Sequence, residues 1–174
     1  MIADLTLPCD AGPGERSLLL RRAVLDDLPA IVRLLSDDPI SAGRGDVAAE
    51  EDGAAYEAAF RSIARDPGND LVVAVDGAGA VVGTLQLTVI PGMARRGSSR
   101  LLVEAVRVAS AERSAGIGTA LMRWVLDVAA IELRTPLVQL TSDAARTDAH
   151  RFYLRLGFVD SHVGFKRRVE LPGS

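Results

Sequence analysis

Two glycines stand at the start of a helical pattern near the middle of this chain. Arg113, Gly116 and Gly118 belong to the run Arg-Ser-Ala-Gly-Ile-Gly, which follows an apolar segment of strand character. A helix start leaves backbone N–H groups without intrahelical partners, and the aligned peptide dipoles make that end positive. Because glycines keep bulky side chains away from these amides, the pattern favours a phosphate or pyrophosphate cradle. The alternative is a tight strand-to-helix connection in which the glycines serve packing.

The flanking residues separate this turn from two other phosphate-binding turns. A P-loop requires Gly-Lys followed by Ser or Thr, but Gly118 is followed by Thr119 and Ala120. The dinucleotide fingerprint requires a third small residue, and Leu121 stands in its place. The turn therefore belongs to neither group.

The composition indicates one globular domain with a mild excess of acid. The chain has 174 residues, of which 48% are hydrophobic, and its formal net charge is −3. That charge, together with an aromatic content of 4%, argues against a nucleic-acid partner. No apolar run is long enough to span a bilayer, and no signal segment opens the chain, so we expect no membrane partner and a cytoplasmic location. The single cysteine excludes an internal disulfide.

Hydrophobic periodicity predicts a mixed α/β sheet with helices on both faces. We expect a flexible tail over residues 1–16 and one domain over residues 17–171. The strands expected before and after the long helix should be parallel neighbours, and Gly83 within a strand suggests a bulge or a close backbone approach. The expected strands are 17–24, 71–75, 80–89, 100–109, 137–141, 158–159 and 163–171, and the expected helices begin at 26, 56, 116 and 143.

Three sequence features together resemble the GNAT superfamily of acyl-CoA-dependent N-acyltransferases. The first is the turn Arg113-x-x-Gly116-x-Gly118, and the second is the strand carrying Glu104 before it. The third is the closing signature, which this chain spells with Ala149, Phe152, Tyr153, Gly157 and Phe158. The resemblance covers roughly residues 18–169, and the segment from Thr141 is similar to a bacterial branch that includes aminoalkylphosphonate N-acetyltransferases.

The resemblance implies a GNAT-like fold of six to seven strands in which a central parallel pair splays into a V. It implies acetyl-CoA as the donor and a primary amine of a small molecule or a peptide as the acceptor. Ser114 stands where the family commonly has glycine, and Arg146 stands where it often has asparagine. The residues that would hold the cofactor are Val106, Arg107, Val108, Arg113, Ser114, Ala115, Gly116, Ile117, Gly118, Thr119 and Arg146.

Two residues would carry the chemistry that the resemblance implies. Glu104 would free the amine's lone pair, because burial in a strand would raise its pKa towards the range of a useful base. Tyr153 would protonate the departing thiolate, since its reference pKa of about 10 lies above the ~8.5 of a thiol. The alternatives are a structural ion pair for Glu104 and a core position for Tyr153.

The acceptor side of the site is less defined. Arg95 and Arg96 lie in a glycine-containing loop where they could bind an anionic group, and His162 could line the acceptor pocket. The acidic segment 37–52 points instead to a cationic acceptor. No metal site is expected, because the two histidines lack suitable neighbours. The family's habit favours a homodimer, and the alternative function is a catalytically inactive acyl-CoA-binding regulatory module.

Overall fold

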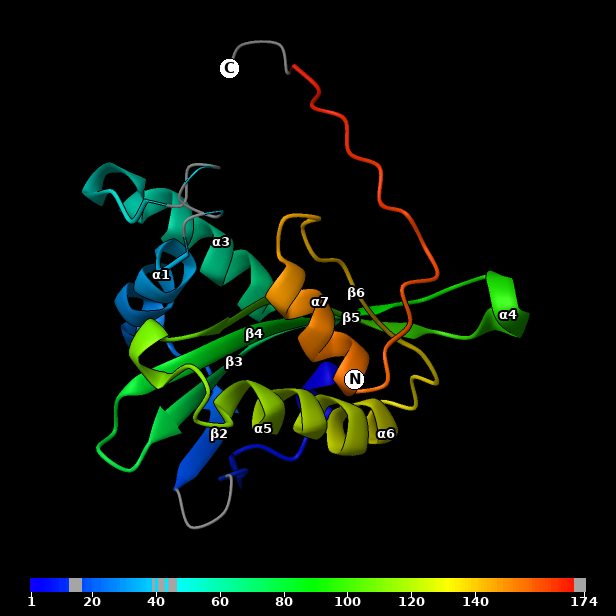
Figure 1. Ribbon diagram of the computed structural model, residues 1–174, viewed down its shortest axis with the longest axis horizontal. Coiled ribbons are helices and arrows are strands. Elements are labelled where there is room, and N and C mark those ends of the chain that lie inside the picture. The colour runs from blue at the N-terminus through cyan, green and yellow to red at the C-terminus, as the bar shows by residue number, and fades with distance from the viewer. Residues whose placement is uncertain (13–16, 39, 41–42, 44–46, 171–174) are drawn as a thin grey trace. The chain divides into compact units, whose positions relative to one another are not determined.

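The computed structural model describes residues 1–12, 17–38, 40, 43 and 47–170 (Figure 1). It divides into two compact units, Met1–Leu140 and Thr141–Ser174, and each is described by itself below.

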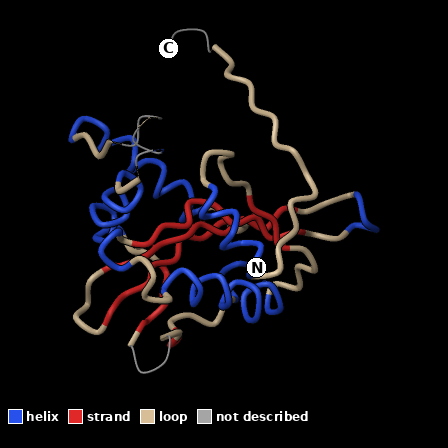
Figure 2. Tube along the Cα trace, in the orientation of Figure 1, coloured by secondary structure: helices blue, strands red, loops and turns tan. Residues whose placement is uncertain are grey.

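The first unit is built on a six-stranded sheet whose strands lie in chain order (Figure 2). Neighbouring strands from β1 to β5 are antiparallel, and β5 pairs with β6 in parallel. The predicted mixed sheet is therefore confirmed, including the parallel pair around the long helix. The strands are β1 Cys9–Asp10, β2 Leu18–Arg22, β3 Asn69–Asp76, β4 Val81–Ile90, β5 Arg100–Val108 and β6 Val138–Leu140.

Helices cover both faces of this sheet, with α1 and α3 on one side and α5 and α6 on the other (Figure 1). The helix that begins at the glycine turn continues from α5 through a π-helical turn, Val125–Ala129, into α6. The helices of this unit are α1 Leu28–Ser36, α3 Gly53–Arg65, the short α4 Ala94–Gly97, α5 Ile117–Trp124 and α6 Ala130–Glu132.

Gly83 allows α5 to approach β4 closely. A Cβ at Gly83 would lie 3.2 Å from Leu121 Cδ1 and 3.2 Å from the carbonyl oxygen of Arg107. Leu121 and Ile117 are buried at this contact. Because any side chain on this residue would press against both helix and strand, glycine is required for packing, as the sequence suggested.

The parallel pair of strands separates within β5. The pairing runs from Leu101 opposite Val138 to Val103 opposite Leu140, while β5 itself continues to Val108. The register with β4 shifts just beyond this point, and Ala105 adopts a left-handed conformation with φ of 50°. Such bulges bend a strand and increase its twist. The second half of β5 therefore leaves its parallel neighbour, as the predicted V requires.

The expected flexible tail is not seen in residues 1–12. Ile2 and Leu5 are each only 3% exposed, and β1 pairs with β2. The guanidinium of Arg22 donates to the carbonyl oxygens of Ile2 and Leu5, at 3.0 and 3.3 Å. These contacts join residues far apart in sequence, which is why local composition did not reveal them. Residues 13–16 lie outside the described residues.

The second unit contains one helix, α7 Thr147–Arg155, among its described residues. The predicted helix over 143–156 is thus confirmed in its central part. The ring of Tyr153 contacts those of Phe152 and Phe158, with centroids 5.2 and 5.8 Å apart.

The closing strands expected at 158–159 and 163–171 are wrong within residues 158–170, which contain no strand. Residue 171 lies outside the described residues. A strand needs a hydrogen-bonded neighbour, and the described part of the chain supplies none here.

Candidate active site

The second half of β5 presents a backbone edge that no described strand pairs with. The Ala109 N–H donates to the Val82 carbonyl oxygen at 2.9 Å, and Arg107 lies opposite Thr84 on β4. Because successive residues of a strand alternate in direction, the backbone groups of Val106 and Val108 face away from β4. They therefore face the side that β6 has left. The Val106 carbonyl oxygen accepts a hydrogen bond from the Arg107 guanidinium at 2.9 Å, so the edge offers mainly its N–H groups.

The turn after β5 leads directly into the open end of α5. Ser114 and Gly116 both have left-handed backbones, with φ of 67° and 85°. The first hydrogen bond of the helix runs from the Ala120 N–H to the Gly116 carbonyl oxygen, at 2.9 Å. The amides of residues 117–119 precede this bond, and no side chain of the described residues caps them. Left-handed residues next to a helix start gather N–H groups into a concave anion-binding surface.

Asp37, at the C-terminal end of α1, holds this turn in place. Its carboxylate accepts the Ser110 N–H at 2.7 Å, and its carbonyl oxygen accepts the Arg113 guanidinium at 2.7 Å. The Ser110 amide, followed by the Ser110 side chain and the nearby charge of Arg113, holds the pKa of Asp37 below its ordinary value. Sequence reasoning missed this contact, since 73 residues separate Asp37 from Ser110 and no local pattern joins them.

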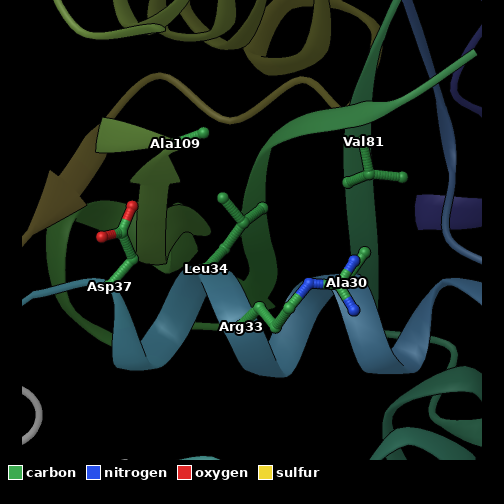
Figure 3. A pocket seen from close by; sticks show the side chains of 6 residues that line it. All are labelled: Ala30, Arg33, Leu34, Asp37, Val81 and Ala109. Atoms are coloured by element: carbon green, nitrogen blue, oxygen red, sulfur yellow. The ribbon is translucent and has the colours of Figure 1, made fainter. Parts of the chain in front are cut away.

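A cavity of about 290 Å³ lies beside the contacts between Asp37 and the turn (Figure 3). Apolar side chains form most of its lining, and Arg33 runs along α1 away from Asp37. From this part of the chain only Ala109 lines the cavity, and Ala109 follows β5, five residues beyond Glu104. The cavity therefore lies beside the turn. Its lining residues are Ala30, Arg33, Leu34, Asp37, Val81 and Ala109.

Glu104 lies at the point where β5 leaves β6, opposite Gln86 on β4. Its side chain is exposed, so the expectation of a buried carboxylate is wrong. The physical reason is the alternation along β5: Glu104 points to the face of the sheet opposite to that of the buried Leu101 and Val103. The role of Glu104 as a base stays a prediction.

Arg95 and Arg96 lie in the connection between β4 and β5, and both are exposed. This connection precedes the first residue of β5, whereas the glycine turn follows the last. Nine residues of strand span about 30 Å. The structure therefore places these arginines at the opposite end of β5 from the glycine turn, with Glu104 between the two.

The remaining predicted residues belong to the second unit. Tyr153 is half-buried among aromatic rings, and Arg146 directly precedes α7. His162 is exposed and shares a 2.8 Å hydrogen bond with the Ser161 hydroxyl, while His150 contacts the Asp143 carbonyl oxygen at 2.8 Å. The roles of Tyr153, Arg146 and His162 beside the turn stay predictions.

Two further features of the described residues bear on cofactors and membranes. No group of three or more His, Cys, Asp or Glu side chains is arranged to hold a metal ion within the described ranges. In that same part of the chain, every helix is too short or too polar to cross a bilayer.

Comparison with known proteins identifies the family. The Acetyltransferase (GNAT) family matches residues 28–158, which run through both units. A Bacillus halodurans C-125 protein described as a transcriptional regulator is 39% identical, with a TM-score of 0.82, over 87% of this chain and 99% of that one. A Trypanosoma brucei acetyltransferase is 25% identical, with a TM-score of 0.66, over 88% and 99%. No curated protein matches the chain.

A more distant structure shares the fold. Glucosamine-6-phosphate N-acetyltransferase from Arabidopsis thaliana is 15% identical, with a TM-score of 0.70, over 88% of this chain and 99% of that one.

Proposed function

Since the chain belongs to the GNAT acetyltransferase family, we propose that it transfers an acetyl group from acetyl-CoA to a primary amine of a small molecule or a peptide. The family makes the protein an acetyltransferase; the acceptor and the direct attack in a ternary complex are the proposal. The observation that carries it is the free edge of β5, which leads straight into uncapped helix amides.

This arrangement fits an elongated donor with an anionic end. The N–H groups of Val106 and Val108 would pair with the amide-containing arm of acetyl-CoA. The amides of Ser114 and of residues 116–119 would hold its pyrophosphate, at the positive end of the helix dipole, whereas the Ala115 N–H donates to the Glu112 carbonyl oxygen at 3.3 Å. Arg113 contributes chiefly by fixing the turn, because its guanidinium already donates to the Asp37 carbonyl oxygen.

The reaction forms one bond and breaks another. The amine nitrogen attacks the thioester carbon, so that an N–C bond forms and the C–S bond breaks. Glu104 accepts the amine proton, and its exposure favours transfer through a water molecule. The phenol of Tyr153 then protonates the leaving sulfur. Of the amides of Val106 and Arg107, that of Val106 faces the free edge and would stabilise the developing oxyanion.

Direct transfer is favoured by the position of Cys9. It lies in β1, and four strand spacings, about 19 Å, separate β1 from β5. Burial is the main cause that raises the pKa of the Cys9 thiol, so little of it is in the nucleophilic thiolate form. An acyl-enzyme intermediate on this cysteine is therefore disfavoured.

The chemical class of the acceptor amine is the most specific part of the proposal. The closing segment resembles the aminoalkylphosphonate branch, and Arg95, Arg96 and His162 would suit an anionic group on the acceptor. The acidic residues of segment 37–52 favour a cationic amine instead; Asp46 lies outside the described residues. We also propose a homodimer and a cytoplasmic location.

A regulatory function carried by the same acyl-CoA site is the second candidate. The similar Bacillus halodurans protein is described as a transcriptional regulator, which favours it.

Release of CoA distinguishes these functions. Purified protein is incubated with acetyl-CoA and a panel of aminoalkylphosphonates, polyamines and amino-terminal peptides, and free thiol is measured. The enzyme should release CoA with at least one class, and Tyr153→Phe should lower turnover by about 100-fold with acetyl-CoA affinity unchanged. Acetyl-CoA binding by calorimetry without CoA release from any amine would favour the regulatory candidate, and no binding would exclude both.

A further inference from the structure

The carboxamide of Gln86 on β4 is held by a hydrogen bond from β4 to β3 and lies beside Glu104. Gln86 is opposite Glu104 across β4 and β5, and Asn69 is opposite Thr88 across β3 and β4. The Asn69 side-chain oxygen accepts the Gln86 side-chain nitrogen at 3.1 Å, and it also accepts the Thr88 hydroxyl at 2.6 Å. The side chain that neighbours the proposed base is therefore fixed at its nitrogen end.

Asp66 determines which way both carboxamides point. Its carboxylate accepts the Gly68 N–H at 2.8 Å and the Asn69 side-chain nitrogen at 3.0 Å. An ionised carboxylate only accepts, so the nitrogen of Asn69 must face Asp66, and its oxygen must face Gln86. That oxygen in turn requires the nitrogen of Gln86. The Gln86 Oε1 atom is therefore left for another donor, and none of the described residues donates to it.

Gln86 and Glu104 present two hydrogen-bond acceptors next to each other. Side chains directly opposite on antiparallel strands have Cβ atoms about 4.5–5.5 Å apart. An amide oxygen and an ionised carboxylate cannot bond to each other, because neither has a proton to donate. Gln86 is half-buried and Glu104 is exposed, so a ligand can reach both. A ligand group that combines N–H donors with a positive charge satisfies the two acceptors together.

The two side chains lie on the face of the sheet that α1 covers in part. Thr84 is two residues before Gln86 on β4 and so shares its face. Opposite Thr84, Val73 packs against Ile31 of α1. Helix α5 approaches the other face of β4, at Gly83. A ligand of Gln86 and Glu104 therefore approaches from the face opposite the helix that begins at the glycine turn.

We propose that Gln86 Oε1 and the Glu104 carboxylate together bind the reacting nitrogen of the acceptor as an ammonium group. This inference rests on the proposed acetyl transfer and names the residue that orients its acceptor. The ammonium donates one N–H to each side chain. When one proton passes to Glu104, Gln86 still accepts an N–H of the neutral amine, so the freed lone pair points away from Gln86 and can attack the thioester carbon. Asp66 and Asn69 are positioning residues.

Gln86→Leu tests the assignment in the reaction. Leucine has a similar volume and no acceptor atom, and Thr88 still satisfies the Asn69 oxygen. With the amine that releases CoA fastest, the KM for the amine should rise about 10- to 100-fold, because a charged donor loses its partner, while the KM for acetyl-CoA stays unchanged. Thr88→Val removes the other hydrogen bond to Asn69, is the matched control and should leave both KM values unchanged. An unchanged amine KM in Gln86→Leu would overturn the inference and leave acetyl transfer standing.

A binding experiment without acetyl-CoA separates this inference from the proposed function. The side-chain amide signal of Gln86 in NMR spectra of the full-length protein is assigned by its loss in Gln86→Leu. The protein is titrated with butylammonium and with tetramethylammonium, which carry the same charge, although only butylammonium has N–H groups. Butylammonium should shift the Gln86 signal, and tetramethylammonium should not. No shift with butylammonium, or equal shifts with both cations, would overturn the inference whether or not any amine releases CoA.

Discussion

The connection before β5 and the connection after it both contain residues with left-handed backbones, but different contacts stabilise them. Arg95 and Arg96, before the strand, have φ of 54° and 61°; Ser114 and Gly116, after it, have φ of 67° and 85°. The first connection is stabilised locally, by the Ser98 hydroxyl donating to the Arg95 carbonyl oxygen at 2.8 Å. The second is held from outside by Asp37 on α1.

The difference shows how to interpret backbone strain. A left-handed non-glycine residue costs roughly 1–2 kcal/mol. In an exposed hairpin, the geometry of the turn is sufficient explanation. After β5, a distant element holds Ser110 and Arg113, and Arg113 directly precedes the left-handed Ser114 close to the start of a helix. Strain that is held by an independent contact is the stronger sign of a functional site.

We propose that the chemistry takes place between the middle and the C-terminal end of β5, and Glu104→Gln tests this proposal with the largest expected effect. Loss of the proton acceptor should lower kcat by about 100- to 1,000-fold and flatten the acidic limb of the pH–rate profile. Glu57→Gln is the control and should leave both unchanged, because Glu57 lies on α3, where its half-buried side chain pairs with Arg61. An unaltered profile in Glu104→Gln would remove the residue from the mechanism.

Gly116→Val and Gly97→Val compare the two ends of β5 directly. Both glycines have left-handed backbones, with φ of 85° and 78°, so both substitutions introduce similar strain and should lower the melting temperature alike. Gly116→Val should also weaken acetyl-CoA binding by about 10- to 100-fold, because amides that hold a charged group are displaced. Gly97→Val should leave binding intact, as measured by calorimetry. Equal losses in the two variants would contradict the assignment of the cradle.

The sequence predicted those features that neighbouring residues determine. Periodicity identified β4, β5 and α5, and the glycines identified the turn. The sequence did not reveal the burial of Ile2 and Leu5 or the contacts of Asp37 with the turn after β5, because these depend on contacts between distant segments. The sequence also predicted a buried Glu104 side chain, whereas Glu104 points to the face of β5 opposite to that of the buried Leu101 and Val103.

The closing segment after α7 also shows that a sequence pattern does not reveal contacts between distant segments. Its alternation is typical of a strand, and the sequence therefore predicted strands at 158–159 and 163–171, which the structure does not show within residues 158–170. Whether a strand forms depends on a partner, which residues 158–170 do not find within the described sheet. Sequence pattern therefore indicates which face of a strand would be buried, but it does not identify the segment that would cover that face.

Asp37→Asn tests the contacts between Asp37 and the turn after β5, and it has the smallest expected effect. The folded-state pKa of Asp37 is lowered, chiefly by the Ser110 amide, so its carboxylate stabilises the protein at neutral pH. This contribution falls away as the pH drops below the reference pKa of about 3.9 and through the lower folded value. Asp37→Asn should therefore lower the melting temperature at pH 7, and its difference from the wild type should shrink as the pH falls below about 3.9.

The matched control for this variant is Asp76→Asn. Asp76 accepts the N–H groups of Ala78 and Ala80 in the β3–β4 turn, so its loss also removes hydrogen bonds to backbone amides. The KM for acetyl-CoA should rise about 2- to 5-fold in Asp37→Asn and stay unchanged in Asp76→Asn. If both variants lost stability and neither changed KM, Asp37 would support the fold alone, and strain held by a distant contact would no longer distinguish the two ends of β5.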